Sequence, residues 1–406
     1  MRKFDLLIIG AGSAGTAAAL SAYAAGKKVA VAEKSLIGGT CVNSGCIPFK
    51  SFFNITQEIA QSHRGIVGLP IIENKFDYAR IVNEVNHRIE SVRKSLEFSL
   101  RNICVLHGVA TITDKHHAVV GNEEIEFDYL LIATGSRPTS EVSPTEQLFA
   151  FTSLPQEITV VGSGATGIET ASILAKLGVH VTLQEKQEVI SPGIPKILRK
   201  ELEVMLRREG IVLKTSCGEI PENALICSGR NPVLPEFLNK APVSEIGSDG
   251  GIWVNKKQQT SVENWFAAGD ICSGTPKLAY IASFQAKKAV EAMFDFGAYW
   301  ETEPHFVPYC IFAPAPLAWF GDLDDPNLLI ERKSYKAVPA AITYNDTRGF
   351  VITAADKNGQ IVGAAICGTA AHEMIHRLLI CAEYKITLED LHRKVLTLHP
   401  VLSELL

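Results

Sequence analysis

Two cysteines stand five residues apart in the segment GGTCVNSGCIPFK, an arrangement that suits thiol–disulfide chemistry. In an ideal α-helix the Cα atoms of Cys41 and Cys46 would lie roughly 8.6 Å apart. A disulfide spans only roughly 4.4–6.8 Å between Cα atoms, so the two can pair only if Cys41 lies outside the helix of Cys46. The intervening NSG suits such a turn. A cysteine at a helix N-terminus near a lysine such as Lys50 has a lowered pKa and a reactive thiolate, whereas the alternative is two inert buried cysteines.

Near the end of the sequence, HPVLSE places His399 and Glu404 five residues apart. A carboxylate that orients an imidazole makes a general acid–base pair. Taken alone, the same pattern also fits an ordinary surface histidine before a proline.

A competing motif is HEMIH, in which His372, Glu373 and His376 match the helical zinc-protease pattern HExxH. No third histidine follows at the metzincin spacing, and no glutamate stands where such enzymes find a third ligand. We therefore expect no metal site here, and a helix whose Met374 and Ile375 face a core.

Two glycine-rich turns, GAGSAG and GSGATG, are each followed by a glutamate. Glu33 and Glu185 each stand 23 residues after the first glycine of their turn. The glycines permit a tight turn, a close approach of pyrophosphate and close helix packing, and the phosphate rests on the helix N-terminus. Two such turns in register predict two dinucleotide-binding units. Glu185 favours NADH over NADPH, because a carboxylate accepts bonds from a ribose 2′-hydroxyl and repels a 2′-phosphate.

The residues around the turns predict repeated βαβ units followed by a different domain. The first unit has strands at 4–9 and 28–32 around a helix that ends at about Ala25. The second has strands at 158–161 and 180–183 around a helix at 168–177, and a polar amphipathic helix at 77–101 lies between the units. The last third predicts an α+β domain with strands near 340–344, 350–354 and 361–366 and helices from residue 372 onward.

Composition bounds the class of protein. With 406 residues, several domains are expected, and 47% hydrophobic with 20% charged residues excludes disorder. The 39 basic residues against 44 acidic ones make a nucleic-acid-binding stripe unexpected. Nine scattered cysteines favour a reducing, cytoplasmic compartment. Residues 6–26 carry no charge, but glycines interrupt them, so a strand, turn and helix is preferred to a signal peptide or membrane span.

These motifs together resemble the flavin-dependent pyridine nucleotide-disulfide oxidoreductases, the group with dihydrolipoamide dehydrogenase, glutathione reductase and mercuric reductase. GAGSAG, GGTCVNSGCIPFK, LLIATGSRP, GSGATGIE, FAAGD, the AHEMI helix and HPVLSE occur in the family's order over nearly the whole chain. The resemblance implies an α/β protein with two Rossmann-like dinucleotide-binding domains and a C-terminal α+β dimerisation domain. The implied boundaries are 1–152 with 241–304 for FAD, 153–240 for a shortened NAD(P) domain, and 305–406 for the interface.

The resemblance also implies the cofactor-binding residues. Those for FAD are Gly10, Gly12, Ala14, Gly15, Glu33, Lys34, Gly39, Thr40, Cys41, Cys46, Lys50, Val109, Ala133, Thr134, Gly135, Gly269, Asp270 and Ala279, with Asp270 at the ribityl chain. Those for NAD are Gly162, Gly164, Gly167, Glu169, Glu185 and Gly229.

Catalytic roles follow from the same resemblance. Cys46 is implied as the flavin-facing charge-transfer thiol and Cys41 as the interchange thiol that attacks the substrate disulfide. Lys50 and Glu169 are implied as a buried pair beside the flavin ring. His399, held by Glu404, is implied to protonate the leaving thiolate from the other subunit, so a homodimer with shared active sites is expected.

The sequence departs from the family at Phe49, Val401 and the pair Ala315-Pro316, and the stretch between Gly210 and Gly229 is short. The leading hypothesis is an NADH-linked dithiol–disulfide oxidoreductase most like dihydrolipoamide dehydrogenase, with a lipoyl-domain protein or a small disulfide as partner. One alternative is a reductase of another acceptor, such as a metal ion, a low-molecular-weight disulfide or an oxidant. Another is a flavoprotein redox sensor or scaffold with impaired NAD turnover. No nucleic-acid or membrane partner is expected.

Overall fold

A computed structural model describes residues 1–63, 76–140, 142–239, 245–297 and 303–406, and the chain divides into two compact units. Unit 1 comprises Met1–Phe52, Phe76–Thr152 and Gly229–Glu303, and unit 2 comprises Phe53–Lys75, Ser153–Ser228 and Pro304–Leu406. The division into FAD, NAD(P) and interface domains at the predicted boundaries stays a prediction, and residues 241–244 of the second FAD segment lie outside the described residues.

Unit 1 is built on a mixed sheet whose centre is parallel. Its strands are β1 (Arg2–Ile9), β2 (Val29–Glu33), β3 (Cys104–His107), β4 (Ala110–Ile112), β5 (His117–Val120), β6 (Glu123–Ile132) and β13 (Trp265–Ala267). The order is β3-β2-β1-β6-β5-β4, with β13 also paired to β6. Strands β3, β2, β1, β6 and β13 run parallel, whereas β4 and β5 continue the sheet antiparallel. The first predicted βαβ unit is therefore present.

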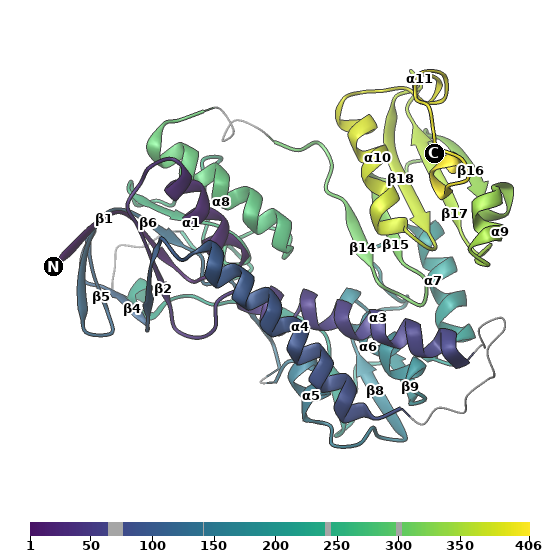
Figure 1. Cartoon of the computed structure of the whole chain (residues 1–406), viewed down its shortest axis with the longest axis horizontal. Helices are drawn as coiled ribbons and strands as arrows, with labels where there is room; N and C mark the ends of the chain where they lie inside the picture. Colours follow the sequence, from purple (N-terminus) through teal and green to yellow (C-terminus); the bar gives the residue numbers. More distant parts are fainter. Residues whose placement is uncertain (64–75, 141, 240–244, 298–302) are drawn as a thin grey trace. The chain divides into compact units, whose positions relative to one another are not determined.

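Helices α1 (Ser13–Ala24) and α8 (Ala279–Phe294) cover this sheet, where small residues allow close packing. The other helices of unit 1 are α2 (Gly39–Asn43), α3 (Cys46–His63), α4 (Tyr78–Ser99) and α5 (Pro144–Ala150), of which α3 continues into unit 2. Helices α1 and α8 lie side by side (Figure 1), and Ala18, Ala22, Ala286 and Ala289 are fully buried between the helices and the sheet. The predicted polar helix is α4, which begins after Asp77, whose carboxylate accepts the N–H of Arg80.

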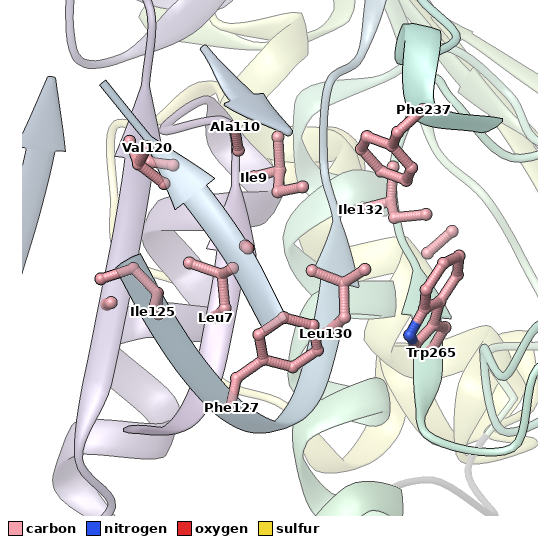
Figure 2. Packing of buried hydrophobic residues seen from close by; sticks show 14 of the residues in the cluster. Leu7, Ile9, Ala110, Val120, Ile125, Phe127, Leu130, Ile132, Phe237 and Trp265 are labelled. Atoms are coloured by element: carbon pink, nitrogen blue, oxygen red, sulfur yellow. The ribbon is translucent and has the colours of Figure 1, made fainter. Parts of the chain in front are cut away.

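The opposite face of the sheet carries the larger side chains. Figure 2 shows Leu7 and Ile9 of β1 beside Leu130 and Ile132 of β6, with Phe237 and Trp265 on one side. The rings of Phe237 and Trp265 meet edge to face, with centroids 6.0 Å apart. Burial on both faces explains why β1 is an almost continuous apolar run.

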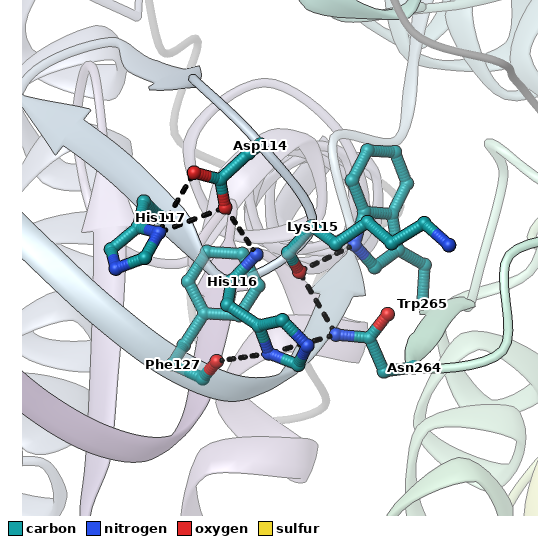
Figure 3. A network of polar contacts seen from close by, with 7 residues as sticks. All are labelled: Asp114, Lys115, His116, His117, Phe127, Asn264 and Trp265. Atoms are coloured by element: carbon teal, nitrogen blue, oxygen red, sulfur yellow. Dashed lines mark hydrogen bonds and ion pairs between the residues drawn. The ribbon is translucent and has the colours of Figure 1, made fainter.

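A polar network fixes the start of β13 (Figure 3). The side-chain amide of Asn264 donates to the carbonyls of Lys115 and Asp128, at 2.9 and 3.1 Å. The indole N–H of Trp265 donates to the same Lys115 carbonyl at 3.2 Å, and the His116 ring lies 3.0 Å from the carbonyl of Phe127. These bonds hold β13 at the sheet, and β13 leads directly into Gly269 and Asp270.

Unit 2 contains the second βαβ unit. Its sheet has the order β10-β9-β8-β11 and is parallel throughout, from β8 (Glu157–Val161), β9 (His180–Gln184), β10 (Val212–Lys214) and β11 (Ala224–Ile226). Helix α6 (Ala165–Lys176) begins three residues before its predicted start. Helix α7 (Lys196–Arg208) buries Leu198, Leu202 and Leu206 at a spacing of four. In the described chain no strand lies between β10 and β11.

The rest of unit 2 is an antiparallel sheet of order β14-β15-β18-β17-β16, covered by α10 (Ala371–Glu383) (Figure 1). The strands are β14 (Tyr309–Ile311), β15 (Leu317–Phe320), β16 (Leu329–Ser334), β17 (Phe350–Ala355) and β18 (Ile361–Cys367), and α11 (Leu388–Lys394) follows α10. As predicted, α10 buries Met374 and Ile375.

The strand predicted at 340–344 is wrong. This segment forms helix α9 (Pro339–Thr343), because Pro339 suits the first position of a helix and the two alanines after it favour helical backbone.

None of the helices that the structure describes combines the length and the apolar composition needed to cross a membrane.

The contact between the first and third glycines of each turn gives a test of this packing. A Cβ at Gly167 would lie 1.8 Å from the Gly162 carbonyl oxygen, whereas a Cβ at Gly193 meets nothing within 4 Å. We expect Gly167→Ala to lower the free energy of unfolding by about 2 kcal/mol, because backbone must shift. Gly193→Ala should change it by less than about 0.5 kcal/mol. Urea titration followed by circular dichroism measures both, and equal stability of the two variants would contradict the packing.

Candidate functional site

The first glycine turn forms a cradle of closely approaching backbone. Gly10 has a φ of 102°, and a Cβ there would lie 2.4 Å from the carbonyl oxygen of Ala133 at the end of β6. A Cβ at Gly15 would lie 1.8 Å from the Gly10 oxygen, and one at Gly39 would lie 2.8 Å from the Gly12 Cα. The predicted glycines and Ala133 therefore come together, leaving room for a pyrophosphate that side chains would fill. The turn fits the phosphates of FAD.

Other predicted FAD residues surround this cradle. Gly269 packs against Ala14, because a Cβ on Gly269 would lie 3.4 Å from the Ala14 Cβ. Ala279 is the first residue of α8, and Ser283 on the same helix donates its hydroxyl to the Ser13 carbonyl at 3.2 Å. Helix α8 is thus fixed to the beginning of α1.

The carboxylate of Glu33 holds the turn closed. Its oxygens accept the backbone N–H groups of Ala11, at 2.7 Å, and Ser35, at 2.8 Å, and the side chain is buried. The carbonyl of Glu33 accepts the N–H of Gly108 at 2.9 Å, which places the exposed Val109 near the end of β2. Lys34 is exposed beside Glu33.

The segment after β6 leads toward Asp270. The hydroxyl of Thr134 donates to the Val233 carbonyl at 2.6 Å, and Gly135 adopts a φ of 70°. The Ser136 hydroxyl donates to Asp270 Oδ2 at 2.5 Å, and the guanidinium of Arg230 contacts both residues. Sequence reasoning missed Ser136 and Arg230. Each of them directly follows a glycine that the sequence does predict as a site residue: Ser136 follows Gly135 in GSRP, and Arg230 follows Gly229 in GRNP.

The second glycine turn repeats the geometry of the first in unit 2. Gly162 has a φ of 99°, Gly167 packs against its carbonyl, and nothing lies within 4 Å of the space a Cβ on Gly164 would enter. Glu185 Oε2 accepts the Ser163 N–H at 3.0 Å and the Ser163 hydroxyl at 2.6 Å. Although burial opposes the charge, donors from Ser163 and Gln187 hold the pKa of Glu185 below its ordinary value. This turn fits a second dinucleotide.

Gly229 lies in unit 1, where a Cβ would meet the Thr139 hydroxyl at 2.1 Å. Because the second glycine turn belongs to unit 2, the predicted contribution of Gly229 to the NAD site stays a prediction.

The paired cysteines lie where two helices meet. Cys41 lies in α2 and Cys46 is the first residue of α3, so Cys41 is outside the helix of Cys46, as the spacing required. The turn between them is fixed by the Thr145 hydroxyl, which donates to the Ser44 carbonyl at 2.8 Å. The guanidinium of Arg93 donates to Asn43 Oδ1 at 2.9 Å. The backbone thus holds the two sulfurs beside each other.

The two thiols have different environments. The thiol of Cys41 is half-buried and donates a hydrogen bond to the sulfur of Cys46, and this bond first and burial second raise the pKa of Cys41 far above its ordinary value. The Ser13 hydroxyl hydrogen-bonds to Cys41 and opposes that shift. Cys46 is exposed. Of the pair, Cys41 is therefore the thiol that holds its proton, through its hydrogen bond to Cys46.

A cleft of about 640 Å³ lies in unit 1. It is lined by Ser13, Thr16, Ala17, Leu20, Ser21, Gly38, Val42, Val92, Leu96, Ser283 and Lys287. Two of these residues adjoin Cys41, since Ser13 hydrogen-bonds to it and Val42 follows it in the chain. Five of the eleven lining residues are aliphatic, and Lys287 is the one charged residue of the lining.

The predicted flavin-side pair is divided between the units. Lys50 lies on α3, one turn after Cys46, whereas Glu169 is buried on α6 of unit 2. The Glu169 carboxylate accepts the backbone N–H of Phe312 at 3.1 Å. The pairing of Lys50 with Glu169 stays a prediction.

At the end of the chain, His399 and Glu404 form the predicted pair. His399 Nδ1 lies 3.1 Å from Glu404 Oε2, and Glu404 Oε1 accepts the N–H of Val401 at 2.8 Å. The Val401 N–H first and His399 second hold the pKa of Glu404 below its ordinary value. Arg377 braces the segment through the Thr397 hydroxyl at 3.1 Å. The carboxylate binds one ring nitrogen, and the ring is 67% exposed, so the other nitrogen can exchange a proton.

In the HEMIH segment, His376 and Glu373 are exposed on α10. Within the described residues no three His, Cys, Asp or Glu side chains gather as metal ligands do.

Comparisons with known proteins agree with this geometry. The family model for pyridine nucleotide-disulphide oxidoreductases matches residues 4–219 and 222–286, and the model for the dimerisation domain of that family matches residues 307–406. These matches confirm the predicted fold class.

Several curated proteins are similar over nearly the whole chain. Dihydrolipoyl dehydrogenase from Haloferax volcanii is 28% identical, covering 98% of this chain and 94% of the relative. The Bacillus subtilis protein of the same name is 27% identical, covering 99% of this chain and 94% of the relative. A mercuric reductase from Lysinibacillus sphaericus is 26% identical, covering 99% of this chain and 80% of the relative.

Among solved structures, the Cu(II) complex of the HOCl-induced flavoprotein disulfide reductase RclA from Escherichia coli is similar with a TM-score of 0.86 and 25% identity. The match covers 100% of this chain and 98% of that one. Because the two family models together account for most of the chain and agree with its glycine turns and cysteine pair, the protein belongs to the pyridine nucleotide-disulphide oxidoreductase family and is a flavoprotein oxidoreductase.

Proposed function

We propose that the protein is an NAD-linked oxidoreductase of an aliphatic dithiol, most like a dihydrolipoyl dehydrogenase. The observation that carries the proposal is the pair of unequal thiols, one of which hydrogen-bonds to Ser13 in the lining of the cleft. Two of its relatives bear that name at 28% and 27% identity. A bound FAD supplies a two-electron carrier between the nicotinamide and the cysteines.

Thiol exchange follows from the environments of the two sulfurs. When a disulfide is reduced, Cys41 loses its proton to a base and attacks one substrate sulfur, so the substrate S–S bond breaks and a mixed disulfide forms. The departing thiolate takes a proton, and the Cys46 thiolate then attacks Cys41, forming the Cys41–Cys46 disulfide and releasing the second thiol. Oxidation of a dithiol is the reverse. The raised pKa of Cys41 makes the base necessary.

The proposed base is His399, with Glu404 holding one ring nitrogen. Orientation by a carboxylate leaves the other nitrogen to accept the Cys41 proton and to return it to the departing thiolate. The family match at 307–406 is a dimerisation domain. We propose that His399 serves the cysteines of a second copy, so that a homodimer has two shared sites.

The lining of the cleft supports an aliphatic substrate. Leu20, Val42, Val92 and Leu96 offer apolar walls to a hydrocarbon chain, and Lys287 offers one cation to an anionic end. A polyanionic peptide disulfide would leave most of its carboxylates unpaired there. The lining therefore favours a lipoyl group, free or on a lipoyl-domain protein.

The nicotinamide cofactor is proposed to be NADH. Glu185 ends β9 as a charged carboxylate with a lowered pKa, and a negative charge at this position repels a 2′-phosphate.

A second candidate is the reduction of another acceptor, such as a metal ion or an oxidant. The observation that favours it is the solved structure at 25% identity, which is a Cu(II) complex of an HOCl-induced reductase.

Anaerobic NADH is expected to reduce the flavin and to produce a long-wavelength charge-transfer band that Cys46→Ser lacks. The matched control is Cys104→Ser, because this cysteine lies on β3 and its sulfur accepts a hydrogen bond from Arg2 of β1. Dihydrolipoamide should then reduce NAD⁺. Flavin reduced by dithionite but not by NADH would identify the sensor or scaffold, whereas turnover with Cu(II) but not with dihydrolipoamide would establish the second candidate.

Replacing the proposed base should separate its step from flavin reduction. We expect His399→Gln to lower kcat for dihydrolipoamide by roughly 10²–10⁴-fold and to leave the rate of flavin reduction by NADH unchanged. His376→Gln, on the exposed face of α10, is the control. If kcat for dihydrolipoamide and the rate of flavin reduction by NADH fell by the same factor, His399 would act through folding and not as the base.

A second variant tests the role of Glu404. Because the Val401 N–H and His399 hold the pKa of Glu404 below its ordinary value, its carboxylate is ionised at neutral pH and binds both the ring and the turn. Glu404→Gln should lower kcat for dihydrolipoamide less than His399→Gln does and leave the rate of flavin reduction by NADH unchanged. An unchanged kcat would exclude Glu404 as the residue that orients His399.

Lys287 provides a test of substrate class. Lys287→Gln should raise KM for dihydrolipoate, which ends in a carboxylate, about fivefold, and leave KM for dihydrolipoamide nearly unchanged. Lys256→Gln, an exposed lysine outside the cleft, serves as the control. Equal changes for the two substrates would exclude Lys287 as the partner of the anionic end.

A further inference from the structure

Arg230 opens the short strand β12 (Arg230–Pro232), which pairs with β7 (Ser136–Pro138). Its guanidinium grips one residue of the partner strand in two places. Nε donates to the Ser136 hydroxyl at 2.8 Å, and Nη2 donates to the Ser136 carbonyl at 2.8 Å. A planar fork that makes two bonds to one residue has a fixed orientation.

Both Ser136 and Arg230 also contact Asp270. The Ser136 hydroxyl donates to Asp270 Oδ2 at 2.5 Å, and Arg230 Nε lies 3.8 Å from that oxygen. Ser136 is 7% exposed, so little water competes for these bonds. Three segments distant in the chain are thus joined through one hydroxyl.

The guanidinium also reaches the cysteine turn. Nη2 lies 3.5 Å from the Thr40 hydroxyl, and Thr40 precedes Cys41 in α2. The Thr40 carbonyl packs against Gly45, where a Cβ would lie 2.9 Å away, and Gly45 precedes Cys46. Arg230 therefore contacts the side chain of Thr40, whose backbone precedes Cys41 and packs against the residue before Cys46.

The charges around Cys46 agree with this placement. Burial lowers the pKa of Arg230, whereas attraction to Asp270 and to Cys46 raises it. Since the attraction is mutual, the guanidinium stabilises a thiolate at Cys46. Asp270 offsets part of this positive charge, Lys50 lies one turn along α3, and the Cys41 thiol donates a hydrogen bond to Cys46.

We propose that Arg230 is a positioning residue of the redox site: anchored by Ser136, it holds Asp270 in place and keeps a fixed positive charge beside Cys46 that favours its thiolate. The proposal rests on the proposed function only in treating Cys46 as a reacting thiol. A purely structural role in joining β7 to β12 would need no charge, since backbone pairing already links these strands.

Alkylation of Cys46 measures the thiolate without turnover. The dithiothreitol-reduced full chain is treated with iodoacetamide across pH 5–10, and peptide mass spectrometry gives the rate at Cys46. We expect Arg230→Gln to raise the midpoint by about one pH unit, so that alkylation below the midpoint slows about tenfold. Arg230→Lys keeps the positive charge but lacks the planar guanidinium, so it should raise the midpoint of Cys46 alkylation by less than half as much. Arg137→Gln, the exposed neighbour on β7, should leave it unchanged.

Ser136→Ala separates position from charge, since it removes the Nε bond and keeps the bond from Nη2 to the carbonyl of residue 136, while the net charge stays the same. We expect the midpoint of Cys46 alkylation to rise by about half a pH unit in this variant. Ser136→Ala tests the role of Arg230 if Arg230→Gln does not fold. Unchanged midpoints in the folded variants, verified by circular dichroism, would overturn the proposal. Because no acceptor or nicotinamide is used, failure of the proposed substrate leaves this result intact.

Discussion

The bond between a glycine turn and the carboxylate at the end of the neighbouring strand fixes both dinucleotide sites. Glu33 accepts the N–H of Ala11 at 2.7 Å, and Glu185 accepts that of Ser163 at 3.0 Å. A bond from N–H to an ionised carboxylate is stronger than one between neutral groups. Each turn is therefore formed before a nucleotide binds, with the first N–H groups of α1 or α6 directed at one place. The glutamate that is predicted to bind the ribose also supports the turn, so we expect a substitution at either glutamate to alter both binding and folding.

The two turns differ at one position, and the difference adds contacts within unit 2. Ala11 offers only its backbone, whereas the Ser163 hydroxyl donates to Glu185 at 2.6 Å and accepts the Ser191 N–H at 2.7 Å. The loop that leads from β9 to α7 is thereby tied to the second glycine turn. Where no strand of the described chain lies between β10 and β11, this hydroxyl provides a connection within the domain that an alanine could not provide.

Local chemistry made much of the site predictable from the sequence. The glycine turns, the break between Cys41 and Cys46 and the contact of His399 with Glu404 each depend on residues close together in the chain. Arg230 was missed because its partners are distant, with Ser136 94 residues and Thr40 190 residues away. The strand predicted at 340–344 failed for the opposite reason, since Pro339 decided the backbone locally while periodicity was ambiguous over five residues.

The unequal thiols give the dithiol a direction. The Cys41 thiol donates a hydrogen bond to Cys46, and helix N–H groups at the start of α3 favour a negative charge on the Cys46 sulfur. Cys41 is half-buried and hydrogen-bonds to Ser13, which lines the cleft. In the proposed exchange, Cys41 becomes a nucleophile only when a base removes its proton, and Cys46 gives up its charge when the Cys41–Cys46 disulfide forms. This division of roles requires the turn between α2 and α3, because in one continuous helix the two sulfurs could not share a proton.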